Sequence, residues 1–163
     1  MTVVCRALVI ALVLVLGANG PASGREGIVG VASVIDGDTI EIHGQPIRFH
    51  GIDAPESSQL CHRENGEPWR CGQQAALAMS DKIGRSVVRC DPKDRDRYGR
   101  IVAICFKDTL DLSRWMVDQG WAVAYRKYSL DYVADEDRAR MERRNIWSGS
   151  FELPWDWRAK KKK

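Results

Sequence analysis

The sequence predicts an α+β fold, a five-stranded OB-type Greek-key β-barrel with three helices. Three observations support this prediction. Apolar and polar residues alternate in five short segments, as they do in half-buried strands. One helical pattern follows the third of these segments, and two more follow the fifth. No repeat or linker divides the 163 residues, a length that suits one domain.

The five strand-like segments cover residues 27–35, 39–43, 47–51, 86–90 and 101–106. The turn His43-Gly44-Gln45-Pro46 joins the second and third segments into a hairpin. Pro55 ends the third segment, because proline has no N–H group for a strand ladder. Residues 91–97 (DPKDRDR) are predicted to form a charged turn between the fourth and fifth segments.

Helical patterns cover residues 73–83, 110–119 and 131–144, and Gly84 and Gly120 end the first two. Residues 57–70 are predicted to form a polar loop. Near the end of the chain, residues 151–157 form an aromatic segment that should pack onto the body. The four lysines at 160–163 are expected to form a disordered basic tail.

Residues 1–24 differ in kind from the rest of the chain. An apolar run at residues 7–16 follows Arg6 and precedes a segment of small residues, which is the order of a secretory signal peptide. The run is shorter than the roughly 20 residues that span a bilayer, although an uncleaved membrane anchor stays open as an alternative. We therefore expect a folded domain at residues 25–159 that is secreted or periplasmic.

Four cysteines lie outside this signal segment, and an even number in an exported domain favours two disulfides. Cys61 and Cys71 bracket a polar loop, whereas Cys90 and Cys105 lie in two neighbouring strand-like segments. Of the three possible connectivities, we favour Cys61–Cys71 with Cys90–Cys105. A zinc site is disfavoured because no pair has CxxC spacing. In a cytosolic chain, reduced cysteines would be expected instead.

Acidic residues lie at both ends of the predicted hairpin. Asp38 precedes it, Asp53 and Glu56 follow it, and Arg48 interrupts its second strand. Because a hairpin brings its ends together, Asp38 should lie near Asp53 and Glu56. Clustered carboxylates repel one another unless a cation lies between them. The sequence therefore predicts a hard divalent metal, an arginine or both at this position.

These side chains suit the hydrolysis of a phosphodiester. A metal offsets the negative charge that builds up, arginines such as Arg48 and Arg100 bind phosphate, and a carboxylate such as Glu56 orients or deprotonates water. The sequence has no P-loop, HExxH or supported serine-histidine-aspartate pattern for other chemistry. The net charge of +3 is too small to attract nucleic acid globally, so cations must act locally.

Each of these features also has a purely structural interpretation. The segment Asp36-Gly37-Asp38 alone is typical of a turn, and Arg48 alone of a strand residue in an ion pair. Arg100 alone could extend along the surface toward water. The residues interpreted as structural are the histidines His43, His50 and His62 and the tryptophans Trp115, Trp121, Trp147, Trp155 and Trp157.

The motifs IDGDT, GIDAPE, DRYGR, GWAVAY and NIW, with an arginine in the third strand, occur in an order and spacing that resembles the staphylococcal nuclease (thermonuclease) family. The resemblance covers about residues 27–147. It implies an OB barrel with helices and a Ca²⁺-dependent nuclease that acts on DNA and RNA. The hairpin before Arg48 is shorter than in the type member and the loop at residues 57–70 differs, so sequence preference is not carried over.

The resemblance also implies individual roles. Asp38 and Asp53 would be metal ligands, together with the backbone carbonyl of Ala54, which replaces a threonine of the type member. Glu56 would position or deprotonate the attacking water. The residues implied to hold the substrate are Arg48 and Arg100, which would clamp the phosphate, and Arg97, Tyr98 and Tyr125, which would contact the nucleotide.

The predicted function is that of an exported, monomeric Ca²⁺-dependent nuclease with little sequence preference, favouring single-stranded or locally melted DNA and RNA. One alternative is a non-catalytic OB-fold module that binds single-stranded nucleic acid. Another is a disulfide-stapled protein that binds calcium or a surface partner. The sequence keeps all three acids and both arginines of the predicted site, which favours the nuclease over these alternatives.

Overall fold

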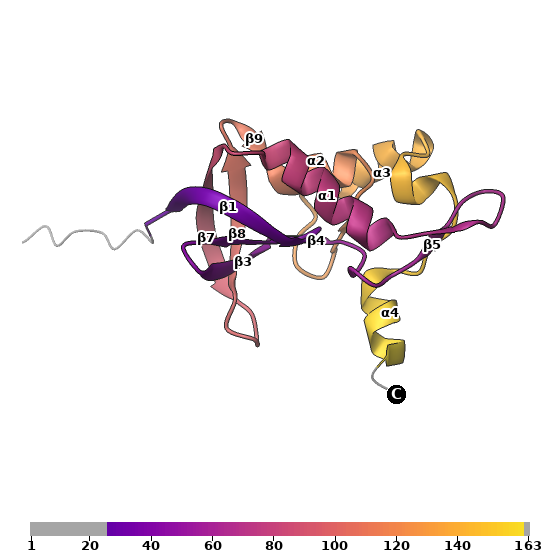
Figure 1. Ribbon diagram of the computed structural model, residues 1–163, viewed down its shortest axis with the longest axis horizontal. Coiled ribbons are helices and arrows are strands. Elements are labelled where there is room, and N and C mark those ends of the chain that lie inside the picture. Colours follow the sequence, from indigo (N-terminus) through magenta and orange to yellow (C-terminus); the bar gives the residue numbers. More distant parts are fainter. Residues whose placement is uncertain (1–25, 162–163) are drawn as a thin grey trace, which may run out of the picture.

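The computed structural model describes residues 26–161. The predicted signal peptide at residues 1–24 lies outside them. The barrel strands gather in one half of the molecule and the helices α3 and α4 in the other, as Figure 1 shows. Within residues 26–161, no helix is both long and apolar enough to cross a membrane.

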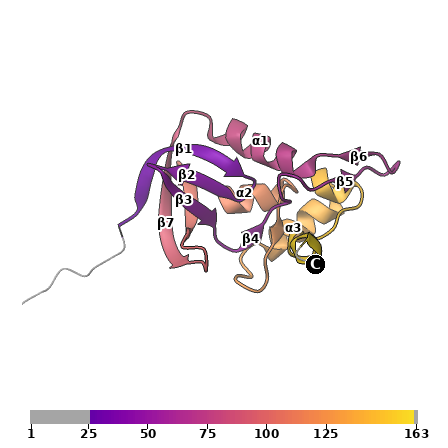
Figure 2. The same ribbon diagram turned by 60° about the horizontal axis from the view of Figure 1, so that its bottom comes forward.

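Five strands form the predicted barrel, and two further residues extend its edge. The sheet order is β3-β2-β1-β7-β8-β9, and a parallel pairing of β3 with β8 closes the barrel. The strands are β1 (Ile28–Asp36), β2 (Thr39–Ile42), β3 (Gln45–Phe49), β7 (Val87–Arg95), β8 (Ile101–Lys107) and the short β9 (Leu110–Asp111). Figure 2 shows β1, β2 and β3 side by side. The α+β barrel predicted from the sequence is confirmed.

The hairpin of β2 and β3 is present, but its turn is shorter than the predicted His43-Gly44-Gln45-Pro46, because Gln45 and Pro46 already pair within β3. Ile42 pairs with Gln45, so His43 and Gly44 form the turn, with φ angles of 53° and 76°. Positive φ at both positions is the requirement of the turn whose twist matches that of the strands. The resulting register places Arg48 opposite Thr39, the residue that follows Asp38.

One predicted turn is wrong, because β7 continues through most of residues 91–97 and ends at Arg95. Arg95 pairs with Ile101 of β8. The register shifts between Pro92 and Asp94, which lets the strand accommodate a proline. The charges in this segment suggested a loop, but pairing with the buried strand β8 outweighs that preference.

The three predicted helices are present, in part with shorter bounds, and a fourth follows them. Within residues 26–161, the four helices are α1 (Cys71–Ile83), α2 (Leu112–Asp118), α3 (Val133–Met141) and α4 (Pro154–Lys161). A 3-10 turn, η1 (Asn145–Ser148), lies between α3 and α4. Pro154 suits the first position of α4, where its missing N–H would have no helical partner. The helix includes Lys160 and Lys161, so these two residues of the predicted disordered tail are ordered.

The predicted loop at residues 57–70 contains a small hairpin, in which β5 (Cys61–His62) pairs with β6 (Pro68–Trp69). Both predicted disulfides are present, Cys61–Cys71 and Cys90–Cys105. The main core fills the barrel and extends to Ala75 and Met79 of α1. A smaller core surrounds the disulfide between Cys61 and Cys71.

Replacing Cys90 and Cys105 together with serine should lower the free energy of unfolding by about 3 kcal/mol. The bridge closes a loop of 15 residues, which limits the freedom of the unfolded chain. Denaturation in urea measures the change, with the reduced wild type as a second route to the same loss. Equal stability of the variant and the oxidised wild type would contradict this expectation.

Candidate active site

The link between β1 and β2 is held directly against the segment that follows β3. A Cβ atom at Gly37 would lie 2.7 Å from the Cβ of Ala54 and 3.0 Å from that of Ala75. The backbone N–H of Ala54 donates a hydrogen bond of 3.0 Å to Oδ2 of Asp38. The absence of a side chain at Gly37 thus allows Asp38 to reach the chain beside Asp53.

Arg48 connects the two aspartates from inside the cluster. Its Nη1 lies 2.8 Å from Oδ1 of Asp38, and its Nη2 lies 2.6 Å from Oδ1 of Asp53. Burial lowers the pKa of Arg48, but the charges of Asp38 and Asp53 outweigh burial and raise it overall. Arg48 is therefore a permanent cation between two buried carboxylates, as the hairpin predicted.

Asp53 is fully buried at the end of β4 (Ile52–Asp53), which pairs with β10 (Val123–Ala124). Burial raises its pKa to about 6, and the charge of Asp38 adds to this increase, while Arg158 and Arg48 oppose it. The backbone N–H of Tyr125 also donates to the carbonyl of Gly51 at 2.8 Å. The pairing of β4 with β10 therefore brings Tyr125 toward the aspartates.

A third arginine, which the sequence analysis missed, enters the cluster from α4. Nη1 of Arg158 lies 2.6 Å from Oε1 of Glu56 and 3.0 Å from Oδ1 of Asp53. Its Nη2 lies 2.7 Å from Oδ2 of Asp53. Arg158 is separated from Asp53 by 105 residues and belongs to no strand pattern. Nothing in the sequence pointed to this contact.

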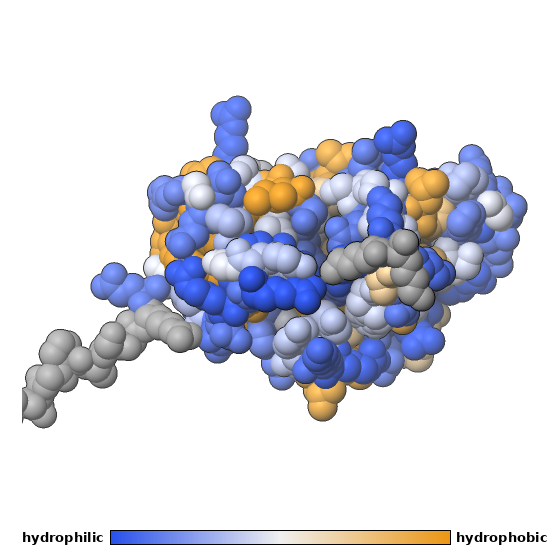
Figure 3. Space-filling model, turned by 90° about the horizontal axis from the view of Figure 1, so that it is seen from below, coloured by the Kyte–Doolittle hydropathy of each residue, from blue (hydrophilic) through white to orange (hydrophobic). Residues whose placement is uncertain are grey.

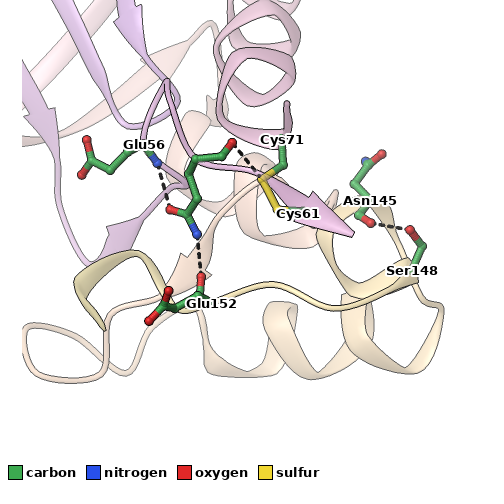
Figure 4. The surroundings of a disulfide bond; sticks show 7 residues. Glu56, Cys61, Cys71, Asn145, Ser148 and Glu152 are labelled. Atoms are coloured by element: carbon green, nitrogen blue, oxygen red, sulfur yellow. Dashed lines mark hydrogen bonds between the residues drawn. A yellow bond between two sulfur atoms is a disulfide. The ribbon is translucent and has the colours of Figure 1, made fainter. Parts of the chain in front are cut away.

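A buried glutamine links Glu56 to the chain that leads into α4. Oε1 of Gln59 accepts a hydrogen bond of 3.2 Å from the backbone N–H of Glu56. Its Nε2 donates one of 2.6 Å to the carbonyl of Glu152. Figure 4 shows Glu56 and Glu152 joined by this chain of hydrogen bonds, close to the disulfide of Cys61 and Cys71. Gln59 thus acts as a positioning residue that the sequence analysis also missed.

The second predicted arginine, Arg100, lies at the end of the loop between β7 and β8. Its Nε donates to Oδ2 of Asp96 at 2.7 Å, and its backbone N–H donates to Oδ1 of the same residue at 3.0 Å. Within the described part of the chain, no ion pair joins Arg100 to the three site carboxylates. The guanidinium carbons of Arg97 and Arg100 lie 4.9 Å and 5.6 Å from the ring centroid of Tyr98, which is 64% exposed.

Tyr125, the predicted nucleotide contact, is covered by α4. Its ring stacks on Trp155 with a centroid separation of 4.9 Å and an interplanar angle of 12°. The ring of Tyr128 contacts it edge-on at 4.8 Å. Burial raises the pKa of Tyr125, and the charge of Asp53 adds to this effect. The side chain is therefore near the site, but one face of its ring is already stacked on Trp155.

The donors around Asp38 fit a hard divalent cation in their chemistry. The carboxylates of Asp38 and Asp53 and the carbonyl of Ala54 supply oxygen alone, which Ca²⁺ and Mg²⁺ prefer. In this structure Arg48 and Arg158 bind the carboxylates. Residues 26–161 contain no group of three or more His, Cys, Asp or Glu arranged to hold a metal. A cation would therefore have to replace arginine contacts.

The structure thus brings together the buried aspartates, the bridging arginine and the glutamate for which the sequence predicts phosphodiester hydrolysis. The family model described as "Staphylococcal nuclease homologue" matches residues 46–149. The chain belongs to the staphylococcal nuclease family, a family of metal-dependent nucleases, and is accordingly a hydrolase of the nuclease class.

Several curated proteins are similar to this chain. The micrococcal nuclease of Shigella flexneri is 31% identical, with 94% of this chain and 91% of that protein covered. An uncharacterized endonuclease of Escherichia coli is 32% identical over 80% of this chain and 84% of its own length. The succinoglycan biosynthesis protein ExoI of Rhizobium meliloti is 46% identical over 63% of this chain, and the match spans about half (54%) of its length.

The region matched by the family model includes Arg48, Asp53, Glu56 and Arg100. Asp38 precedes this region, and the whole of α4 follows it. Asp38, before the match, and Arg158, after it, therefore both contact residues of the matched region at this site. The roles of the individual site residues stay predictions that experiments must test.

Replacing Gly37 with alanine should reduce both stability and any activity of the site. The new Cβ would lie 2.7 Å from the Cβ of Ala54, which is closer than such atoms approach, and at a tight 3.0 Å from that of Ala75, so the two site segments must shift apart. Overpacking of this kind costs about 1–3 kcal/mol, measurable by urea denaturation. Gly27→Ala is the control because its Cβ would make ordinary contacts of 3.4 Å and beyond. Equal effects of the two substitutions would contradict the close-packing argument.

Proposed function

We propose that this protein is an exported Ca²⁺-dependent nuclease that hydrolyses DNA and RNA with little sequence preference. The observation that carries the proposal is the pair of buried aspartates joined by Arg48. Glu56 shares Arg158 with Asp53, which places its carboxylate at the same site. Buried charges of this kind cost several kcal/mol each to desolvate, and function is a reason for a fold to retain them.

Asp38, Asp53 and the carbonyl of Ala54 are the groups that would hold Ca²⁺. When bound there, the ion supplies positive charge against the charge that builds up on the phosphate oxygens. Asp38 and Asp53 are kept in place by Ala54 and Arg48 independently of the ion, through hydrogen bonds of 2.6–3.0 Å. The two carboxylates are therefore held near each other, although a cation would have to replace arginine contacts to bind them.

Arg48 can bind the scissile phosphate without leaving the aspartates. Its contacts with Asp38 and Asp53 use two of the five N–H donors of its guanidinium group. The side chain keeps 16% of its surface exposed, so a phosphate can reach the remaining donors. In this arrangement the two aspartates orient Arg48, and Arg48 holds the phosphate beside them.

Glu56 is the group that orients or deprotonates the attacking water. Its side chain is one-third exposed, so water can reach it, while Gln59 fixes its backbone. Arg100 would move from Asp96 to the phosphate when substrate binds. Its pair with Asp96 is partly exposed, and such pairs contribute only about 0–1 kcal/mol. Breaking the pair of Arg100 with Asp96 therefore costs little free energy.

The exposed tip of the loop between β7 and β8 suits contacts with a nucleic-acid strand. Tyr98 offers an exposed ring, and Arg97 offers a guanidinium beside it. Stacking on an aromatic ring tolerates every base and favours unpaired strands. We therefore propose single-stranded or locally melted DNA and RNA as substrates, acted on by a monomer, with residues 1–24 directing export.

The purified protein should release acid-soluble nucleotides from denatured DNA and from RNA in the presence of Ca²⁺. A chelator should abolish this release, and added Ca²⁺ should restore it. Gel-shift experiments with the same DNA report binding separately. Binding with no hydrolysis at any Ca²⁺ concentration would support the alternative of a non-catalytic binding module.

Replacing Glu56 with glutamine should lower the rate of hydrolysis by roughly 10²–10⁴-fold, the contribution of a general base. The amide retains the size of the side chain and an oxygen for Arg158, so the fold should persist. Glu64→Gln is the matched control, since Glu64 is exposed and pairs with Arg143 on the surface. Retention of at least half of the wild-type rate by Glu56→Gln would remove Glu56 from the reaction.

A further inference from the structure

Helix α4 lies outside the region that the family model matches, yet two of its side chains reach the predicted site. In Figure 1 it projects from the lower edge of the molecule next to the C-terminus. Of its eight residues, only Pro154 is buried. The helix is attached to the body by the ion pairs of Arg158 and by Trp155, which packs partly buried against the smaller core.

Arg158 occupies the carboxylate oxygens that a cation would use. Both oxygens of Asp53 accept hydrogen bonds from it, and Oδ1 of Asp53 is shared with Arg48. Oε1 of Glu56 accepts a third hydrogen bond from Arg158 at 2.6 Å. While these contacts hold, a cation cannot take Asp53 as a ligand without displacing Arg158, and Oε1 of Glu56 is already bound to Arg158.

Trp155 has an equivalent relation to the predicted nucleotide contact. Its ring is nearly parallel to that of Tyr125, at a distance typical of stacked rings. A base that stacked on the same face of Tyr125 would have to displace Trp155. The same short helix therefore contacts both predicted sites. The guanidinium of Arg158 binds the carboxylates of Asp53 and Glu56, and the ring of Trp155 stacks on Tyr125.

The contacts that hold α4 closed differ in their exposure. Arg158 binds both oxygens of the fully buried Asp53, whereas its pair with Glu56 lies partly in solvent. Arg158 and Glu56 are each about one-third exposed, so their pairing is weakened by solvent and salt. Beside the helix lies an open pocket of about 590 Å³, lined in part by Ser58, His62, Trp157 and Lys161. The face of the molecule seen in Figure 3 is mainly hydrophilic. The apolar contact that movement of the helix would open is that of Trp155 with the smaller core.

We infer that α4 is a self-blocking segment, in which Arg158 and Trp155 take the places of the divalent cation and of a base. The inference rests on the proposed metal and nucleotide sites. Ca²⁺ competes with Arg158 for Asp53, and a nucleotide competes with Trp155 for Tyr125. Either ligand shifts α4 away from the site, because each binds only the open arrangement.

The direct test is Ca²⁺ binding to the full-length protein by isothermal titration calorimetry, without nucleic acid. Arg158→Met keeps the aliphatic stem but removes the competing charge, so Ca²⁺ should bind about tenfold or more tightly than to the wild type. Lys160→Met is the matched control on the same helix, since Lys160 pairs with Glu152. It should keep the wild-type affinity to within about twofold.

A second variant tests the aromatic contact independently. Trp155→Ala should bind a short thymidine oligonucleotide several-fold more tightly in the presence of EDTA, where no hydrolysis occurs. Hydrogen exchange should also show that Ca²⁺ increases the exchange of amides in residues 154–161 of the wild type. These measurements do not depend on turnover.

Different failures have different meanings. Hydrolysis that requires Ca²⁺, with equal affinities for Arg158→Met and Lys160→Met, would overturn the self-blocking role and leave the proposed function intact. A loss of rate in Arg158→Met at saturating Ca²⁺, with unchanged affinity, would make Arg158 a phosphate ligand and also overturn it. No Ca²⁺ binding by any variant would overturn both proposals.

Discussion

The ion pairs of Arg48 with two buried aspartates are the constraint on which the site depends. Asp38 and Asp53 come from opposite sides of the β2–β3 hairpin, and neither could stay charged in the interior without a nearby cation. The close approach at Gly37 and the hydrogen bond from Ala54 set the distance between the two segments. The barrel, through the register of β2 with β3, then places Arg48 between them.

Much of this part of the site could be predicted from the sequence because it is local. A hairpin with a His43-Gly44 turn fixes its own register, so acids at its ends must meet. Arg158 and Gln59 could not be predicted in this way. Arg158 is 105 residues from Asp53, and Gln59 is 93 residues from Glu152, the distant one of its two partners. Neither residue belongs to a pattern with a period. The extension of β7 was missed for a similar reason, since its charged residues are held by a partner strand.

Helix α4, which follows the region matched by the family model, contacts residues of the predicted site. The region that the family model matches contains most of β3 and the later barrel strands, and it includes Asp53, Glu56 and Tyr125. The pairing of β4 with β10 brings Tyr125 toward Asp53. The chain after that match then supplies competing partners for all three. A site with strong negative charge is thereby kept neutralised by the protein itself until a ligand of higher affinity arrives.

A crystal structure of the protein grown with Ca²⁺, with the ion located by its anomalous scattering, tests the central claim most directly. The account predicts one ion at 2.3–2.6 Å from oxygens of Asp38, Asp53 and the Ala54 carbonyl, the usual range for calcium. Arg158 should no longer contact Asp53 in that structure. Calcium bound elsewhere, or no calcium with Arg158 still on Asp53 at saturating concentration, would contradict it.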